Sequence, residues 1–511
     1  MKKISSILFH RVFFIALALV VQVAALILMI GRFSNYFPEL YGLTTALSAV
    51  AVLAIASGTN KPTYKIAWMI PIVFFPIFGM IFYFLLGSNR TSKRLTEKIN
   101  QIDQRTTSFL TANKALLEEL SKHDKQAGRQ ARYIQEQAGF PLYRHNFSQF
   151  YPLGELKFLE MKKELSKAQK YIFMEYFIIT KGVMWDSILE ILAEKAKQGV
   201  DVRLIYDDAG CILTLPHGYD RKLEALGIKT ARFHPIVPVI SPRLNNRDHR
   251  KLTVIDGHTG FTGGINLADE YINAFEKHGH WKDSGILIKG EAVWPLTTMF
   301  LAMWEYLTDT TEDYEQFRPV PPVQAAASEK AFIQPFGDSP FGREAVGETV
   351  YLNLINRAED YIYINTPYLI LEGEMITALC LAAKSGVDVR IVTPHIADKP
   401  FVHAVTRSYY QTLLKSGVRI YEYTPGFMHS KTFVADDKVA VVGTINLDYR
   451  SLYLHFENGV WLYKTESVLQ IKDDFVQTLE FCLEMTVDLY YNLPAYKKMK
   501  RSVLRLFAPL L

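Results

Sequence analysis

One unusual string occurs twice in this chain of 511 residues, and it limits the possible folds more than any other feature. The two copies, HRKLTVID at 249–256 and HSKTFVAD at 429–436, both read His-x-Lys-x-x-x-x-Asp. In both copies an asparagine, Asn266 or Asn446, lies 17 residues after the histidine and follows a turn of small residues. This shared spacing indicates a duplicated unit and not a chance match.

Longer segments around the two strings match as well. The residues AQKYIFMEY at 168–176 resemble AEDYIYINT at 358–366, and GVDVRL at 199–204 resembles GVDVRI at 386–391. Each half reads as a strand, a helix ending at a glycine, a buried strand, a further helix and strand, and then the motif hairpin. Alternating strands and helices predict α/β layers around a mixed sheet. The predicted boundaries are 136–318 for the first half, 319–331 for a Pro- and Ala-rich linker, and 332–495 for the second half.

The motif also predicts a chemistry. On a β-strand side chains alternate between two faces, so the histidine and the lysine two residues later point the same way. The glycines behind the motif allow close approach of the backbone, and the asparagine adds an amide donor. Imidazole, ammonium and amide donors converging on one point suit a phosphate group. The candidate residues are His249, Lys251, Asn266, His429, Lys431 and Asn446.

The duplicated string resembles the signature of the phospholipase D superfamily, and flanking segments resemble bacterial cardiolipin synthases in particular. These flanks are TPYLI at 366–370, GVRIYEY at 417–423, DYRS at 448–451 and LFAPLL at 506–511. The resemblance implies an α/β fold in which two pseudo-symmetric phospholipase D-like α/β/α halves form one bilobal body. It also implies one active site built from both motifs. The chemistry agrees, because transfer through a covalent intermediate needs a nucleophile on one side of phosphorus and a proton donor on the other.

The roles of the two histidines follow from this resemblance. By analogy with two-motif relatives, His249 attacks phosphorus and becomes a phosphohistidine. His429 starts protonated, gives its proton to the departing alcohol and later takes one from the incoming alcohol. The motif lysines and the two asparagines would hold the non-bridging oxygens. This scheme needs no cofactor and no metal, and the sequence contains no metal-ligand spacing.

The motif aspartates, Asp256 and Asp436, belong to the signature and count among the candidate catalytic residues, but their position favours a structural role. Seven residues of extended strand separate each from its histidine, a distance of about 20 Å. We expect them to cap the hairpin turns. Asp283 and Glu457, each directly before a strand that follows the asparagine segment, are better placed to orient the histidines, and superfamily members carry an acid there.

The first 87 residues are predicted to be membrane segments. Apolar runs cover 12–30, 40–56 and 66–86, and the first and third are long enough to cross a hydrocarbon core of about 30 Å. A cleaved signal peptide is the alternative for the first run, but its length argues against cleavage. The counts of Lys and Arg beside the runs do not fix the topology. The resemblance implies a multi-pass protein of the bacterial inner membrane whose catalytic part faces the cytoplasm.

Two further segments are polar or basic. Residues 88–135 are predicted to be a largely helical polar linker, and 496–511 a basic amphipathic tail at an anionic membrane surface. The formal net charge of +5 is modest for a chain of this length, which fits a membrane-surface protein better than a dedicated nucleic-acid binder.

The leading hypothesis is a cardiolipin synthase, which transfers a phosphatidyl group from one phosphatidylglycerol to another and releases glycerol. The expected partners are therefore phosphatidylglycerol and cardiolipin in the bilayer, and the oligomeric state stays open. One alternative is a hydrolytic phospholipase D, or a transferase that uses another alcohol. A nuclease is disfavoured by the apolar runs. An inactive membrane scaffold is disfavoured because both histidines, both lysines and both asparagines are present.

Overall fold

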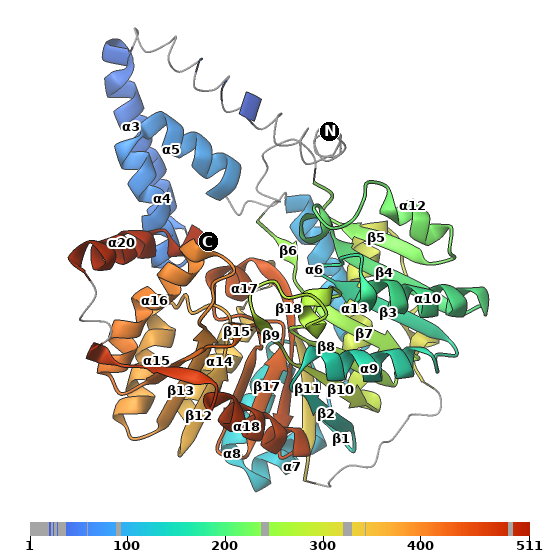
Figure 1. Ribbon diagram of the computed structural model, residues 1–511. Helices are drawn as coiled ribbons and strands as arrows, with labels where there is room; N and C mark the ends of the chain where they lie inside the picture. The colour runs from blue at the N-terminus through green and yellow to red at the C-terminus, as the bar shows by residue number, and fades with distance from the viewer. Residues whose placement is uncertain are drawn as a thin grey trace.

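The computed structural model describes residues 37–58, 60–87, 93–236, 245–319, 330–342, 344–488 and 494–510, together with positions 20, 21, 24 and 28. Two β-sheets, one in each half of the chain, make up the body of the molecule (Figure 1). Most of the predicted linker 319–331 lies outside the described residues.

The first sheet has seven strands in the order β2-β10-β8-β7-β3-β4-β5. Strands β3, β4 and β5 are parallel, and β7, β8, β10 and β2 continue the sheet as antiparallel neighbours. The motif strand β7 therefore lies in the middle of the sheet, between β3 and β8. The strands are β2 (Phe147–Tyr151), β3 (Tyr171–Tyr176), β4 (Asp201–Asp207), β5 (Lys229–Phe233), β7 (Lys251–Ile255), β8 (Thr259–Gly263) and β10 (Gly285–Lys289).

The second sheet repeats this order as β11-β18-β17-β16-β12-β13-β14, so the predicted α/β fold with two related halves is confirmed. Three short strands are added to it: β1 (Tyr143–Arg144) beside β11, β19 (Cys482–Met485) beside β14, and β6 (Arg247–Asp248) beside β18. The repeated strands are β11 (Phe332–Asp338), β12 (Tyr361–Asn365), β13 (Asp388–Pro394), β14 (Arg419–Tyr423), β16 (Thr432–Ala435), β17 (Val439–Gly443) and β18 (His455–Tyr463).

Helices cover both faces of each sheet. Along β3, Tyr171 and Phe173 pack with α13 on one face, whereas Ile172 and Met174 pack with α9 and α10 on the other. The second sheet has α14, α15 and α16 on one face and α18 on the other. These helices are α9 (Gly154–Leu165), α10 (Val183–Lys197), α13 (Trp294–Thr308), α14 (Val346–Arg357), α15 (Gly373–Lys384), α16 (Pro400–Lys415) and α18 (Glu466–Leu479).

Short helical turns connect these elements. They are α11 (Asp208–Cys211), α12 (Tyr219–Glu224), η4 (Asp269–Ile272), η5 (Glu291–Val293), η6 (Tyr314–Phe317) and α17 (Tyr449–Tyr453). Helices α10 and α15 are each followed by a glycine with positive φ, Gly199 (89°) and Gly386 (100°), as the repeated sequence predicted.

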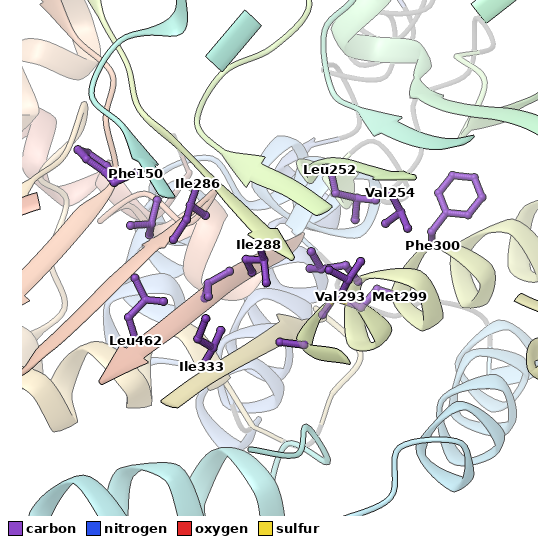
Figure 2. Close-up of a cluster of buried hydrophobic side chains, with 14 of the residues drawn as sticks. Phe150, Leu252, Val254, Ile286, Ile288, Val293, Met299, Phe300, Ile333 and Leu462 are labelled. Atoms are coloured by element: carbon purple, nitrogen blue, oxygen red, sulfur yellow. The ribbon is translucent and has the colours of Figure 1, made fainter. Parts of the chain in front are cut away.

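One hydrophobic core joins the two halves. Figure 2 shows Ile286 and Ile288 of β10 together with Ile333 of β11, Leu462 of β18 and Met299 of α13. These side chains are at most 4% exposed and belong to one contiguous cluster. Because the cluster contains strands from both sheets, the halves form a single bilobal body and not two separate lobes.

Two short parallel pairings join a strand of one half to a strand of the other. β6, just before the first motif, pairs with the start of β18 in the second half. β15 (Gly426–Met428), just before the second motif, pairs with β9 (His280–Lys282) in the first half. Each motif histidine is therefore held against a strand of the opposite half.

The N-terminal helices differ from the prediction. They are α3 (Phe37–Ser57), α4 (Pro62–Phe74), α5 (Pro76–Phe82) and the π-helical turn η2 (Tyr83–Gly87). The predicted span 66–86 is not one helix, because the backbone leaves the helical conformation at Phe75, directly before Pro76. Within the described residues no helix has both the length and the apolar character needed to cross a membrane. The predicted span 12–30 lies almost entirely outside the described residues.

The predicted polar linker contains three helices that pack on the catalytic body. α6 (Lys93–Ser108) contacts α13, and α8 (Lys125–Glu136) contacts α14 and β11, with α7 (Lys114–His123) beside it. The C-terminal segment forms α20 (Ala495–Leu506) and η7 (Ala508–Leu510). α20 packs on α16 and on α4, so the C-terminal helix and the helices α3 to α5 lie on the same side of the body (Figure 1).

Candidate active site

Backbone hydrogen bonds anchor each motif histidine to the other half of the molecule. The His249 amide donates to the carbonyl oxygen of Phe456 (3.0 Å), and the His429 amide donates to that of Lys282 (2.7 Å). Both bonds extend the strand pairings β6–β18 and β15–β9. The position of each histidine is thus set by the packing of both halves.

Each imidazole is also bound to a carboxylate of the opposite half. His249 Nδ1 lies 2.8 Å from Glu457 Oε1, and His429 Nδ1 lies 2.5 Å from Asp283 Oδ2. Both carboxylates are fully buried. Because Nδ1 is taken up by the carboxylate, the ring is fixed in orientation and Nε2 is the nitrogen left for a reacting group.

One cavity of about 520 Å³ contains both histidines. Asn266 and Asn446 line the same cavity. Asn266 donates to the Tyr271 hydroxyl (2.8 Å) and accepts from the Ile178 amide (3.0 Å), which holds it in place. Oδ1 of Asn446 is buried without a hydrogen-bond partner among the described residues. The duplicated motifs therefore build one site and not two.

The motif lysines are buried and are not among the residues that line the cavity. Lys251 and Lys431 are 0% and 1% exposed, and each donates to the main-chain oxygen of its own motif histidine. Burial lowers the pKa of Lys251 to about 7 and that of Lys431 to about 8, and the carboxylates nearby offset this only in part. The charges of both lysines are therefore sensitive to pH close to neutrality.

The histidines are both driven towards the neutral form. Burial, followed by the charge of Lys251, lowers the pKa of His249 well below its ordinary value. Burial and Lys431 lower the pKa of His429 to about 4, although Asp283 acts to raise it. The sequence-based prediction was that His429 starts protonated. In the protein without substrate, burial and the charge of Lys431 instead favour its neutral form. Burial also raises the pKa of Glu457 well above its ordinary value.

The two orienting carboxylates are fitted differently. Gly264 leaves no room for a side chain, since a Cβ there would lie 2.1 Å from Asp283 Oδ1. At the matching position of the second half, the Thr444 hydroxyl instead donates to Glu457 Oε2. The first half thus combines the shorter acid, Asp283, with a glycine. The second half combines the longer acid, Glu457, with the hydroxyl donor Thr444.

The motif aspartates, which count among the predicted catalytic residues, do not line the cavity and bind backbone amides instead. Asp256 accepts from the backbone amides of residues 169–171 at 2.7–2.9 Å, and Asp436 from those of 359–361 at 2.9–3.0 Å. Both residues have positive φ, 51° and 53°. These contacts favour a structural role, as the strand length indicated, but the capped segments are those that begin β3 and β12 and not the predicted hairpin turns.

The residues that line the cavity but were missed from the sequence include Arg247, Trp281, Phe427 and His455. Trp281 and His455 each stand two residues before an orienting acid, and Arg247 and Phe427 each stand two residues before a motif histidine. The alternation of side chains along a strand could have found them, because residues two apart face the same side.

Three side chains have donor atoms that suit a metal ion. The ligand atoms of His249, His455 and Glu457 lie within 4.8 Å of one another. However, Arg450 and Lys251, which lower the pKa of His455, would repel a metal cation in the same way. The charge around this group therefore favours an anionic ligand.

Comparison with known proteins agrees with this architecture. Residues 161–304 and 351–479 match the family described as "Cardiolipin synthase, PLD-like domain", and residues 46–88 match "Phospholipase_D-nuclease N-terminal". A cardiolipin synthase of Alkalihalophilus pseudofirmus is 33% identical over 96% of this chain and 97% of its own length. One of Geobacillus kaustophilus is 34% identical over 96% and 99%.

Two other relatives complete the comparison. An uncharacterized protein of Streptococcus mutans is 43% identical over 90% of this chain and 99% of its own length. The crystal structure of phosphatidylserine synthase from Haemophilus influenzae covers 75% of this chain and 99% of that one, with a TM-score of 0.56 and 15% identity, and so shares the fold. With two paired half-sites and matches over almost its whole length, the chain belongs to the cardiolipin synthase family of phospholipase D-like proteins.

Proposed function

We propose that this protein is a cardiolipin synthase, a phosphatidyltransferase that moves a phosphatidyl group from one phosphatidylglycerol to a hydroxyl of another and releases glycerol. The observation that carries the proposal is the pairing across the halves: His249 with Glu457 and His429 with Asp283, both histidines facing one cavity. Two oriented imidazoles around one phosphorus suit a double displacement. The family relationship supplies the lipid substrate.

The first step forms a phosphohistidine. His249 Nε2 attacks phosphorus, the bond from phosphorus to the glycerol oxygen breaks, and His429 gives that oxygen a proton. A nucleophilic imidazole must be unprotonated, and the pKa of His249 is held well below its ordinary value. His429 is the better placed of the two to carry the proton, because Asp283 opposes the lowering of its pKa. A bound phosphodiester anion would raise the pKa of His429 further and load the proton that the step needs.

The second step reverses the first with a new alcohol. His429 takes the proton from the hydroxyl of the second phosphatidylglycerol, its oxygen attacks phosphorus, and the bond between phosphorus and nitrogen breaks. Lys251, Lys431, Asn266 and Asn446 would stabilise the charge on the phosphate oxygens in both steps. The buried position of the lysines lets their charges act through little intervening water.

We also propose that the N-terminal helices and α20 attach the protein to the bacterial cell membrane, with the catalytic body on the cytoplasmic side. Phe74, the last residue of α4, and Phe75, directly before α5, are 73% and 65% exposed. On α20 the apolar residues Tyr496, Met499 and Val503 are exposed at helical spacing, among lysines and arginines. Exposed apolar side chains with basic neighbours suit an anionic lipid surface.

A product analysis tests the proposed reaction. The purified full-length chain is supplied with phosphatidylglycerol as the only phospholipid, and the lipid and water-soluble products are resolved. Cardiolipin and glycerol in equal amounts are expected. Phosphatidic acid as the main product would show a hydrolytic phospholipase D, and no turnover would show an inactive scaffold; either result contradicts the proposal.

A further inference from the structure

The cavity has two walls that occupy matching positions in the two halves but differ in chemistry. Three pairs of positions match: two residues before the motif histidine, two residues before the orienting acid, and four residues after the motif asparagine. At these positions one wall, which we call the cationic wall, contains Arg247, His455 and Arg450. The opposite wall, which we call the aromatic wall, contains Phe427, Trp281 and Glu270. All six residues line the cavity.

The sheet pairing shows that this correspondence is structural as well as sequential. In the β6–β18 pairing Arg247 stands opposite His455, and in the β15–β9 pairing Phe427 stands opposite Trp281. Two strand pairs with the same geometry thus present a cation and an imidazole in one half-site and two aromatic rings in the other. The pseudo-symmetry of the fold does not require this difference, so it points to two different ligand groups.

Arg450 is the cation of this wall that no carboxylate neutralises directly. Its Nε donates to His455 Nε2 (3.3 Å) and its guanidinium donates to the Asn245 carbonyl (3.2 Å). Among the described residues, no carboxylate oxygen lies within 4.0 Å of it. Asp448 lines the same cavity, but it accepts from the Ser451 amide (2.8 Å). Arg247 differs, because it pairs with Asp207 (3.3 Å).

His455 adds a donor without a partner. Since its Nε2 accepts from Arg450, its proton lies on Nδ1. That Nδ1 is buried without a hydrogen-bond partner among the described residues, and Glu457 Oε1, at 3.8 Å, is too far to accept. The side chain is about nine-tenths buried and lines the cavity. Leaving a buried donor unpaired is costly, so this group is suited to a ligand that accepts hydrogen bonds.

The cationic wall lies where a lipid can reach it. Tyr449, next to Arg450 in α17, stacks on Tyr64 of α4, with ring centroids 5.3 Å apart. Residues of α4 and of α17 share one small hydrophobic cluster. The wall is therefore next to the N-terminal helices, which we propose to lie at the membrane.

We propose that the cationic wall binds the phosphate of the second phospholipid, the one that supplies the acceptor hydroxyl. This inference rests on the proposed function. The donor phosphodiester occupies the histidines, lysines and asparagines, and an acceptor phosphatidylglycerol brings a second negative charge into the same cavity. Without a cation for it, the two phosphates would repel each other at short range. Arg450, supported by His455 and Arg247, supplies that cation.

The test compares two acceptors on one enzyme. With phosphatidylglycerol as donor, cardiolipin formation uses an acceptor with a phosphate, whereas incorporation of labelled glycerol into phosphatidylglycerol uses an acceptor without one. For Arg450→Gln the ratio of cardiolipin formation to glycerol exchange should fall about tenfold, the effect of losing one charge-assisted hydrogen bond. Arg450→Lys, which keeps the charge, should recover part of the ratio. Exposed Arg221 on α12 provides the control, because Arg221→Gln should leave the ratio unchanged.

The outcomes separate this inference from the proposed function. An unchanged ratio in Arg450→Gln, or an equal loss of both reactions, would overturn the acceptor site. If Arg450→Gln does not fold, His455→Gln serves in its place, and its ratio should fall in the same direction. If the wild-type protein catalyses neither cardiolipin formation nor glycerol exchange, the proposed function itself fails.

Discussion

The two halves of the catalytic body share one strand order and one motif, yet they give their histidines different surroundings. In the first half, Gly264 makes room for the short side chain of Asp283. In the second, Thr444 donates to the longer Glu457. Because each acid binds the histidine of the other half, these substitutions tune His429 and His249 separately. The same motif can therefore serve the two proposed roles, nucleophile and acid, because its two copies have different neighbours.

Exchanging the orienting acids for amides should have the largest effect and should differ between the halves. Asp283→Asn removes the charge that raises the pKa of His429, so activity should fall by roughly a thousand- to ten-thousand-fold. Glu457→Gln should cost less, roughly ten- to a hundred-fold, because the raised pKa of Glu457 makes its neutral form easier to reach. Steady-state cardiolipin synthesis by both variants measures this. Unchanged turnover in Glu457→Gln would refute its orienting role.

The fit around the acids gives a second contrast. Gly264→Ala places a Cβ against the Asp283 carboxylate and should displace it, with a loss of about a hundred-fold in kcat. Thr444→Ala removes one hydroxyl donor to Glu457 without a clash, so its loss should stay near tenfold or below. Thermal unfolding of both variants controls for misfolding. Equal losses would mean that the two acids are held in the same way.

The lysines should limit activity on the alkaline side. The lowered pKa values, about 7 for Lys251 and about 8 for Lys431, mean that the charged forms are present at lower pH and are lost as the pH rises through this range. Since kcat/KM reports the free enzyme, it should fall by roughly tenfold per pH unit between pH 7 and 8, where Lys251 loses its charge, and by up to roughly a hundredfold per unit above pH 8, where both lysines do. A profile that stays flat to pH 10 would show that both lysines keep their charge.

The smallest effect is expected at the motif aspartates. Asp256→Asn and Asp436→Asn each weaken hydrogen bonds from three backbone amides, at a cost of about 1–3 kcal/mol in the free energy of unfolding. Asp256 is the more deeply buried, so its variant should lose more stability. The midpoint of thermal unfolding should drop in both while kcat/KM stays within about twofold. A large fall in kcat would show that these aspartates contribute to catalysis and not only to stability.

Much of the catalytic body could be predicted from the sequence, because repeats and strand alternation are local patterns. The six motif residues and the two orienting acids all belong to such patterns. The exchange of acids between halves could not be predicted, since His249 and Glu457 are 208 residues apart and a repeat relates positions only within matching halves. The helix break at Phe75, within the third apolar run, could not be predicted from hydropathy either, because hydropathy does not report the backbone conformation.

Locating the covalent intermediate tests the account most directly. A phosphatidyl ester with a nitrophenol leaving group, which needs no proton to depart, is added to His429→Ala and to His249→Ala, and the modified peptides are identified by mass spectrometry. The account predicts a phosphatidyl group on His249 in His429→Ala and none on His429 in His249→Ala. Modification of His429, or of neither histidine, would contradict the division of roles between the two halves.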